Sequence, residues 1–351
     1  MRKLGRILKW ILVVLLAVVL AVVGSVAVIY RGELKTLLSI EQIEGTDFFT
    51  MEYSGDYGLD EFLQVGAKSD AELKNFIISR LLKGIPMDFE LPELGCSTFA
   101  AKLADGSSVY GRNFDEVACP SMMVITRPEN GYDSISMVNL SYIGFSDDYL
   151  PDSMLNSILT LAAPYVPLDG VNEKGLTAGM LYISSAPTNQ QEDKIDITTT
   201  SAVRMILDKC ATVEEAVEML SNYNMHSSAG GCFHFHIADA QGGSVVVEYV
   251  KDEMLVVEES AATNFLFNRV MGVREIGRDR YDVMKAKLAE NGGVFADMRD
   301  AMSLLEAVAQ HGGPTSQAGT RWSSVYNQTE PALLLSVNRD YENLYSFTLE
   351  K

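Results

Sequence analysis

The 351-residue sequence predicts an α+β protein in which two antiparallel β-sheets pack together between outer helices, behind an N-terminal transmembrane helix. Three observations predict this architecture. An uncharged run of 21 residues lies near the N-terminus, strand and hairpin patterns begin at Cys96, and the pattern after Cys96 changes from strands to helices and back twice, ending on strands. The composition, 47% hydrophobic and 21% charged, is that of a globular protein with a substantial core.

The N-terminal run extends from Trp10 to Tyr30 without a charged residue. As a helix it would measure about 31 Å, which is enough to cross the hydrocarbon of a bilayer. Four basic residues precede it, so the positive-inside rule places the N-terminus in the cytoplasm and everything after residue 30 outside. A cleaved signal peptide, cut near Ser25-Val26-Ala27, is the alternative, although its apolar part normally covers only about 7–15 residues.

Charge and cysteine content limit the possible partners. The formal net charge is −19, and because residues 1–30 hold four basic residues and no acidic one, the rest carries −23. We therefore expect no nucleic acid and no anionic headgroup as partner. Cys96, Cys119, Cys210 and Cys232 permit disulfides in an exported protein, but their spacing matches no zinc motif, and we expect no metal and no cofactor.

Residues 31–95 are a first section that we expect to be helical. Ser69-Asp70-Ala71-Glu72 is a capping box, and the helix that it opens continues to Leu82, before Gly84 and Pro86 end it. This helix is amphipathic, so we expect the section to pack against the rest of the protein.

From Cys96 onward the pattern is that of strands, then helices, with no mark of a second independent domain. Asp105-Gly106 between two strand patterns, 97–104 and 107–112, predicts a hairpin. The other expected strands are 122–127, 134–140, 176–183, 233–239, 244–250, 254–260, 323–327, 332–337 and 344–349. The expected helices are 198–209, 213–222, 281–290 and 297–310.

Cys96 is the first candidate for chemistry. It opens the first strand of the hairpin, while Arg112 and Asp115 end the second strand, so the hairpin should bring all three together. A cysteine attacks carbonyl groups as a thiolate, and therefore needs a proton acceptor and a group that lowers its pKa. The same residues also fit a buried cysteine beside a surface ion pair.

The histidines give a second possibility. Cys232, His234 and His236 alternate along one strand and therefore face the same side. They could form a metal site, or a histidine could serve Cys96 as base. No fourth ligand stands out, and a strand with one polar face is the simpler interpretation.

Five segments after Cys96 stand in a characteristic order: Gly111-Arg112-Asn113-Phe114-Asp115, Gly170-Val171-Asn172-Glu173-Lys174-Gly175-Leu176, residues 233–239 with 243–248, Ala262-Thr263-Asn264 and Asp279-Arg280-Tyr281. Together they resemble the choloylglycine hydrolase family, which includes bile salt hydrolases and penicillin V acylases, over about residues 96–351. The resemblance implies an N-terminal nucleophile hydrolase with a four-layer αββα fold that cleaves linear amides.

The resemblance also implies roles for individual residues. Cys96 would be the nucleophile, and its own free α-amine, with a pKa of about 8, would be the base. Asp115 would orient that amine, Arg112 would lie by the sulfur, Asn264 would donate its side-chain N–H to the oxyanion, and Arg280 matches an arginine of the family site.

Tyr182 and Asn172 fall in the substrate and oxyanion vicinity. Bile salt hydrolases carry asparagine where this chain has Tyr182, whereas penicillin V acylases can have tyrosine. In the family the main-chain N–H at that position is the oxyanion donor, so a tyrosine is compatible with catalysis.

The section before Cys96 departs from simple family members, which remove only a short leader. A membrane span and then Arg31–Gly95 precede the cysteine, a layout that resembles acid ceramidase and its N-acylethanolamine-hydrolysing relative, which cleave themselves at that point. The resemblance implies a proenzyme that cuts its own Gly95–Cys96 bond.

The sequence thus predicts a membrane-anchored, extracytoplasmic cysteine amidase acting on small-molecule amides such as N-acyl amino acids, bile-salt conjugates or penicillin V-like amides. Two other hypotheses stay open. One is a non-catalytic surface-binding protein on a hydrolase scaffold, and the other is a Cys–His thiol hydrolase that needs no processing.

Overall fold

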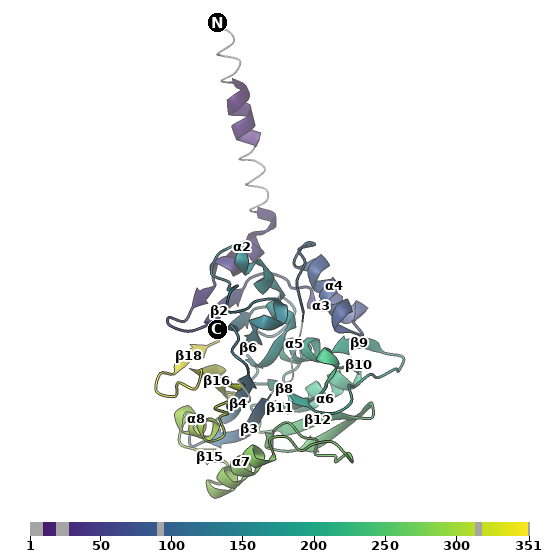
Figure 1. Ribbon diagram of the computed structural model, residues 1–351, viewed down its shortest axis with the longest axis vertical. Helices are drawn as coiled ribbons and strands as arrows, with labels where there is room; N and C mark the ends of the chain where they lie inside the picture. The colour runs from purple at the N-terminus through teal and green to yellow at the C-terminus, as the bar shows by residue number, and fades with distance from the viewer. Residues whose placement is uncertain (1–9, 19–27, 90–94, 313–317, 350–351) are drawn as a thin grey trace.

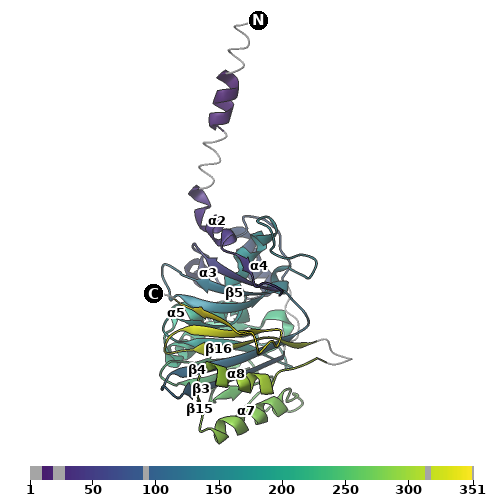
Figure 2. The same ribbon diagram turned by 90° about the vertical axis from the view of Figure 1, so that its left-hand side faces the viewer.

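The computed structural model describes residues 10–18, 28–89, 95–312 and 318–349. Two large β-sheets pack against each other, and helices cover their outer faces (Figures 1 and 2). This is the helix–sheet–sheet–helix arrangement that the sequence predicts.

The larger sheet has nine strands in the order β1-β2-β5-β6-β7-β8-β11-β12-β13. All neighbours are antiparallel except β2 and β5, which run parallel. Their bounds are β1 Glu41–Gln42, β2 Phe48–Tyr53, β5 Ser121–Thr126, β6 Ser134–Asn139, β7 Pro167–Asn172, β8 Thr177–Ile183, β11 Cys232–Ala238, β12 Ser244–Val250 and β13 Glu253–Glu258.

The smaller sheet has the order β14-β3-β4-β16-β17-β18, with β15 pairing in parallel with β3. At its centre lies the predicted hairpin of β3 and β4. The bounds are β3 Gly95–Leu103, β4 Ser108–Glu116, β14 Ala261–Ala262, β15 Val294–Phe295, β16 Gly319–Asn327, β17 Ala332–Val337 and β18 Tyr345–Thr348. A separate parallel pair joins β9 Ile195–Thr198 to β10 Tyr223–His226.

Helices complete the layers. Helix α5 packs on β7 and β8 of the larger sheet, while α7 and α8 pack on β3, β4 and β16 of the smaller sheet (Figure 2). The helices are α2 Arg31–Leu38, α3 Leu59–Val65, α4 Asp70–Arg80, α5 Thr199–Lys209, α6 Val213–Ser221, α7 Arg278–Glu290 and α8 Met298–Ala307, with 3-10 turns η1 Leu140–Ile143, η2 Asn156–Tyr165 and η3 Ser228–Gly230. The four helices expected after Cys96 are confirmed to within three residues at each end.

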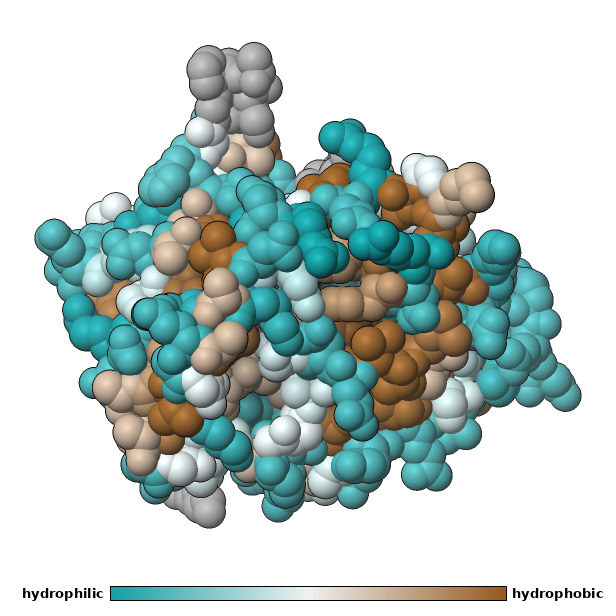
Figure 3. All heavy atoms as spheres, turned by 90° about the horizontal axis from the view of Figure 1, so that it is seen from below, coloured by the Kyte–Doolittle hydropathy of each residue, from teal (hydrophilic) through white to brown (hydrophobic). Residues whose placement is uncertain are grey.

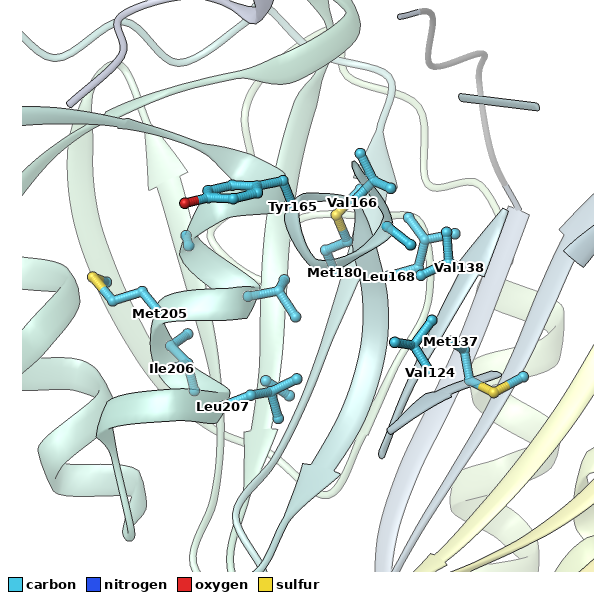
Figure 4. Close-up of a cluster of buried hydrophobic side chains, with 14 of the residues drawn as sticks. Val124, Met137, Val138, Tyr165, Val166, Leu168, Met180, Met205, Ile206 and Leu207 are labelled. Carbon is cyan, nitrogen blue, oxygen red and sulfur yellow. The ribbon is translucent and has the colours of Figure 1, made fainter. Parts of the chain in front are cut away.

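Buried side chains of α5, β7 and β8 form one part of the core (Figure 4). Leu207 of α5 lies so close to β7 that a Cβ added to Gly170 would stand 2.9 Å from its Cδ1 atom. Glycine at position 170 therefore lets the helix approach the sheet.

The sequence predicts a helical first section, but this section contains strands β1 and β2 as well as helices α2, α3 and α4. The capping box is present in altered form. The Ser69 side chain accepts from the Glu72 N–H at 3.3 Å, but the Glu72 carboxylate accepts from Lys68 N at 3.0 Å rather than from Ser69 N. The section packs against the body, as its amphipathic helix predicts.

The sequence prediction also omitted β7, because Pro167, Asp169 and Gly170 are poor strand formers. The strand forms because it is buried between β6 and β8, and Pro167 occupies its first position, where a missing N–H is tolerated.

The expected transmembrane helix, residues 10–30, lies partly outside the described residues. Residues 10–18 form a helix away from the body whose side chains are exposed (Figure 1). Within the described ranges, no helix combines the length and the apolar character needed to cross a membrane. At the opposite end of the molecule, hydrophilic side chains cover much of the surface, with hydrophobic patches between them (Figure 3).

Candidate active site

Cys96 stands at the start of β3, and its position is set by the hairpin. The register pairs Cys96 with Phe114 and Thr98 with Arg112, so Cys96 and Arg112 are diagonal neighbours on one face of the sheet. That face is turned towards the larger sheet, and the Cys96 side chain is fully buried there. The sequence prediction that Arg112 lies beside the sulfur is confirmed, with Nη2 of Arg112 at 3.2 Å from Sγ.

Arg112 is a buried cation with a fixed orientation. Its Nη1 donates to the carbonyl oxygens of Leu168 at 2.9 Å and Met180 at 2.8 Å, and its Nε lies 3.2 Å from the carboxylate of Asp169. Burial raises the pKa of Asp169 to about 6, and Arg112 opposes that rise. The two charges therefore balance each other between the sheets, next to the sulfur.

The thiol of Cys96 is protonated in the uncut chain. Burial raises its pKa to about 11, although Arg112 acts in the opposite direction. A buried thiol of this kind needs a nearby base before it can attack a carbonyl group.

Asp115 reaches a different place from the one that the hairpin suggests. Asp115 pairs with Gly95, whereas Phe114 pairs with Cys96. Because neighbouring side chains on a strand point to opposite faces, Asp115 projects from the face opposite to that of Cys96. There its carboxylate is 3.0 Å from Nη1 of Arg280 and accepts from Thr320 Oγ1 at 2.6 Å. Burial raises the pKa of Asp115, and Arg280 opposes that rise.

Gly95 lies directly against Asp115. A Cβ added to Gly95 would stand 2.8 Å from Cβ of Asp115 and 3.1 Å from its Oδ2. Only glycine fits beside this carboxylate without moving it. The arrangement therefore holds an acid group next to the bond that precedes Cys96.

Arg280 and Asn264 hold the backbone of Cys96. Nη1 of Arg280 donates to the Cys96 carbonyl and to Ser97 Oγ, both at 2.7 Å, and Nη2 donates to Asn264 Oδ1 at 2.9 Å. The same Oδ1 accepts from the Cys96 N–H at 2.8 Å. Arg280 belongs to α7. This helix therefore positions the Arg280 guanidinium at the Cys96 carbonyl, and the guanidinium in turn positions the Asn264 side chain at the Cys96 nitrogen.

The side-chain amide of Asn264 donates to the carbonyl oxygen of Tyr182 at 2.8 Å. This contact brings Tyr182 into the site through its main chain, while its ring packs edge-on against Phe233 at 5.7 Å. The oxyanion role implied for Asn264 stays a prediction, because in the uncut chain this side-chain amide donates to the main chain of β8.

Asn172 has a structural position instead. Its Nδ2 donates to the carbonyls of Leu207 and Cys210, and its Oδ1 accepts from the N–H groups of Lys174 and Leu176. These four bonds shape the turn between β7 and β8 and attach it to the end of α5.

His236 is directed away from the sulfur. Its ring nitrogens lie 2.8 Å from Thr98 Oγ1 and 3.0 Å from Ser244 Oγ, and burial lowers its pKa to about 3. His234 lies 3.6 Å from the carboxylate of Glu248. Neither of these two histidines is therefore poised on Cys96, as the Cys–His hypothesis requires.

The four cysteines are free and buried. Across the described ranges, no group of three or more histidine, cysteine or acidic side chains is arranged to hold a metal ion.

The sequence prediction missed three residues of this site. They are Asp169, Ser97 and Thr320, which bind Arg112, Arg280 and Asp115. Asp169 could have been found, because it is an acidic residue directly before a recognised motif in an otherwise apolar stretch. Ser97 and Thr320 carry no comparable signal.

Comparison with known proteins shows which family the region around this site matches. Residues 96–265 match the family described as linear amide C–N hydrolases, choloylglycine hydrolase family. This part of the chain belongs to the choloylglycine hydrolase family. The match begins at Cys96 and includes Asn264, whereas Arg280 lies beyond it and is brought in by the fold.

Two curated relatives are similar to shorter stretches. A bile salt hydrolase/transferase from Clostridium perfringens is 26% identical over 175 residues, 47% of this chain and 51% of that protein. A penicillin V acylase from Pectobacterium atrosepticum is 27% identical over 99 residues, 25% of this chain and 26% of that protein. The chain therefore spans about half, or less, of the length of the choloylglycine hydrolase relatives that it matches.

The crystal structure of a conjugated bile acid hydrolase variant from Clostridium perfringens is similar in fold. It has a TM-score of 0.54 at 18% sequence identity, over 72% of this chain and 92% of that one. The predicted mixed α+β fold of the family is confirmed by this likeness.

Proposed function

We propose that this protein is a membrane-anchored, extracytoplasmic cysteine amidase that hydrolyses linear amides through a Cys96 thioester, after cutting its own Gly95–Cys96 bond. The observation that carries the proposal is the set of contacts around Cys96. A guanidinium lies at its sulfur, and an asparagine and a second arginine hold its backbone nitrogen and carbonyl.

Maturation would use the nucleophile itself. Sγ of Cys96 attacks the carbonyl carbon of Gly95, the C–N bond breaks, and the thiol proton passes to the departing Cys96 nitrogen. Water then hydrolyses the resulting thioester, which releases the Gly95 carboxylate and restores the thiol. Arg112, 3.2 Å from the sulfur, stabilises the thiolate form during attack.

Catalysis would use the amine that maturation releases. An α-amine with a pKa of about 8 takes the proton of the thiol, and the thiolate attacks the substrate carbonyl. The protonated amine then gives its proton to the leaving amine, and a thioester remains. Water, activated by the same amine, releases the acid and regenerates Cys96.

The neighbouring residues would have distinct roles. Asp115, beside Gly95, orients the new amine, and Arg280 holds the Asp115 carboxylate in place. Asn264, whose side-chain amide lies beside the Cys96 nitrogen, donates a side-chain N–H to the oxyanion.

The substrates would be small linear amides such as N-acyl amino acids, bile-salt conjugates or penicillin V-like amides. The relatives named above, a bile salt hydrolase/transferase and a penicillin V acylase, support this class.

Anchoring with the hydrolase domain outside the cytoplasm is supported by the uncharged run of residues 10–30 behind four basic residues, through the positive-inside rule.

The proposal is tested by measuring amine release from these three types of amide by the purified protein and by two variants. Cys96→Ala should abolish release. Cys119→Ala is the matched control, because Cys119 is also free and buried but its sulfur lies 3.8 Å from Ser121 Oγ, outside this site. Equal activity of wild type and Cys96→Ala would refute the proposal.

A further inference from the structure

An open pocket of about 410 Å³ lies at the end of β3 that is far from Cys96. Its lining comes from β3, from the turn between β11 and β12, and from α7 and the turn after that helix. Lys102, which lines the pocket, follows Cys96 by six residues on the same strand, so the two lie about 20 Å apart. Figure 2 shows β3, β15 and α7 together at the end of the molecule opposite the N-terminal helix. The pocket is therefore separate from the candidate active site.

Lys102 places a positive charge in this pocket. Its half-buried side chain points from the same face of β3 as Cys96, because the two are an even number of residues apart. Its Nζ donates to Ser108 Oγ at 2.7 Å, and that hydroxyl donates in turn to the Ala240 carbonyl at 2.8 Å. A Cβ added to Gly242 would stand 3.1 Å from the same Nζ. The ammonium group thus lies between β4 of the smaller sheet and the β11–β12 turn of the larger one.

This ammonium group has donors left for a ligand. Within the part of the chain that the structure describes, Lys102 forms no ion pair, and Ser108 is its side-chain hydrogen-bond partner. An ammonium group has three N–H donors, and the Ser108 hydroxyl accepts one of them. A bound anion would supply the acceptors for the other two.

The other charged side chains of the pocket already have partners. Nζ of Lys285 lies 2.6 Å from Oε1 of Glu259. The Asp239 carboxylate accepts from three backbone N–H groups, at 2.9 to 3.0 Å. One positive charge, that of Lys102, therefore lacks a carboxylate partner. Because the Asp239 carboxylate lies in the wall, a second negative charge on the ligand would be repelled, and a monoanion fits better than phosphate.

The rest of the lining offers an apolar surface. The apolar side chains come from β3 and α7 and are Ala100, Ala101, Leu288 and Ala289. A volume of about 410 Å³ falls within the range of about 300–1,000 Å³ that is usual for small-molecule sites. A short hydrocarbon chain packed on these side chains would be removed from water, while its charged end reaches Lys102.

We propose that this pocket is a second binding site, separate from Cys96, for a small monocarboxylate with a short hydrocarbon chain. The carboxylate accepts hydrogen bonds from the Lys102 ammonium group, and the hydrocarbon chain packs on Leu288 and Ala289 of α7. The inference goes beyond the proposed amidase activity and does not depend on it, because binding needs neither the cut nor the nucleophile.

Binding of radiolabelled hexanoate to the purified full-length protein tests the inference. The measurement is equilibrium dialysis near neutral pH in a non-ionic detergent, with detergent alone as the blank, so that hexanoate is ionised. The proposal predicts saturable binding that inorganic phosphate, hexylamine and hexanol compete for only weakly, because each lacks either the single negative charge or the hydrocarbon chain. Absence of saturable binding would overturn the proposal.

Two substitutions of Lys102 locate the site. Lys102→Met keeps a long side chain but removes the charge, and should weaken hexanoate binding about tenfold or more. Lys102→Arg keeps the charge and should retain most of the affinity, which separates loss of the cation from a general disturbance of the fold. Binding by Lys102→Met that equals that of the wild type would overturn the proposal, because hexanoate would then bind elsewhere, the candidate active site included.

Two substitutions on α7 complete the test. Ala289→Phe fills the apolar part of the pocket and should also weaken hexanoate binding. Lys287→Met is the matched control, because Lys287 lies on the same helix, is 45% exposed and pairs with Glu290 at 3.2 Å, outside the pocket. A loss of affinity in Lys287→Met as large as that in Lys102→Met would show a general effect of charge and contradict the assigned site.

Discussion

The ion pair between Arg280 and Asp115 should contribute strongly to both stability and maturation. The two side chains are 8% and 4% exposed, and their atoms lie 3.0 Å apart. Replacing Arg280 with methionine leaves a buried carboxylate without its cation, which costs about 3–5 kcal/mol in comparable buried pairs. Total stabilities are roughly 5–15 kcal/mol, so the loss is a large fraction of the whole.

The measurement is urea unfolding in a Cys96→Ala background, so that no cleavage intervenes. Trp322 is a convenient reporter, because it is buried and stacks on Phe114 at 4.0 Å, next to Asp115. Adding Asp115→Asn to Arg280→Met should recover part of the lost stability, since the double variant no longer buries an unpaired charge. In the presence of Cys96, the double variant should still fail to cleave itself.

Arg278→Met is the matched control. Arg278 lies two residues earlier on the same helix, is 43% exposed and forms a surface pair with Asp282 at 3.1 Å. An exposed pair of this kind contributes about 0–1 kcal/mol. If Arg280→Met costs no more than Arg278→Met, the buried pair does not support the site as described.

Three further predictions concern the cut and Glu116, a buried carboxylic acid at the end of β4. Gly95→Val should block self-cleavage in an intact-mass time course, because its Cβ would stand 2.8 Å from Cβ of Asp115; cleavage at the normal rate would contradict this. Burial raises the pKa of the Cys96 thiol to about 11. The self-cleavage rate should therefore rise about tenfold per pH unit between about pH 7 and 9, and a flat profile would exclude thiolate attack. Burial raises the pKa of Glu116 from 4.5 to about 7, so its protonated form is favoured in the fold. Glu116 therefore lowers stability as pH rises from about 4.5 to 7, and Glu116→Gln should stabilise the protein by about 1–3 kcal/mol at pH 8 but not at pH 4; equal effects at both would contradict this.

The hairpin shows what local sequence can predict. Asp105-Gly106 set the turn, and the register that followed put Arg112 beside Cys96. The same reasoning misplaced Asp115, because a shift of one residue along a strand moves a side chain to the opposite face. Its true partners, Thr320 and Arg280, lie about 165 residues or more along the chain.

The strand β2 shows what local sequence could not predict. Phe48–Tyr53 is rich in aromatic residues, but its partner β5 lies about 70 residues later and runs parallel to it. Parallel pairing leaves no turn signal between the strands, so only the folded sheet reveals it. Arg280 is similar, because the resemblance suggested its role but only the packing of α7 against β3 explains how it reaches Cys96.

The central claim is that Cys96 becomes an N-terminal nucleophile by cutting its own chain. Intact mass and N-terminal sequencing of the purified protein, beside its Cys96→Ala variant, test this most directly. The account predicts a wild-type piece that begins Cys96-Ser97-Thr98 and a variant that remains whole. A wild-type chain that stays uncut while it hydrolyses amides would contradict it, because a peptide nitrogen cannot serve as the base.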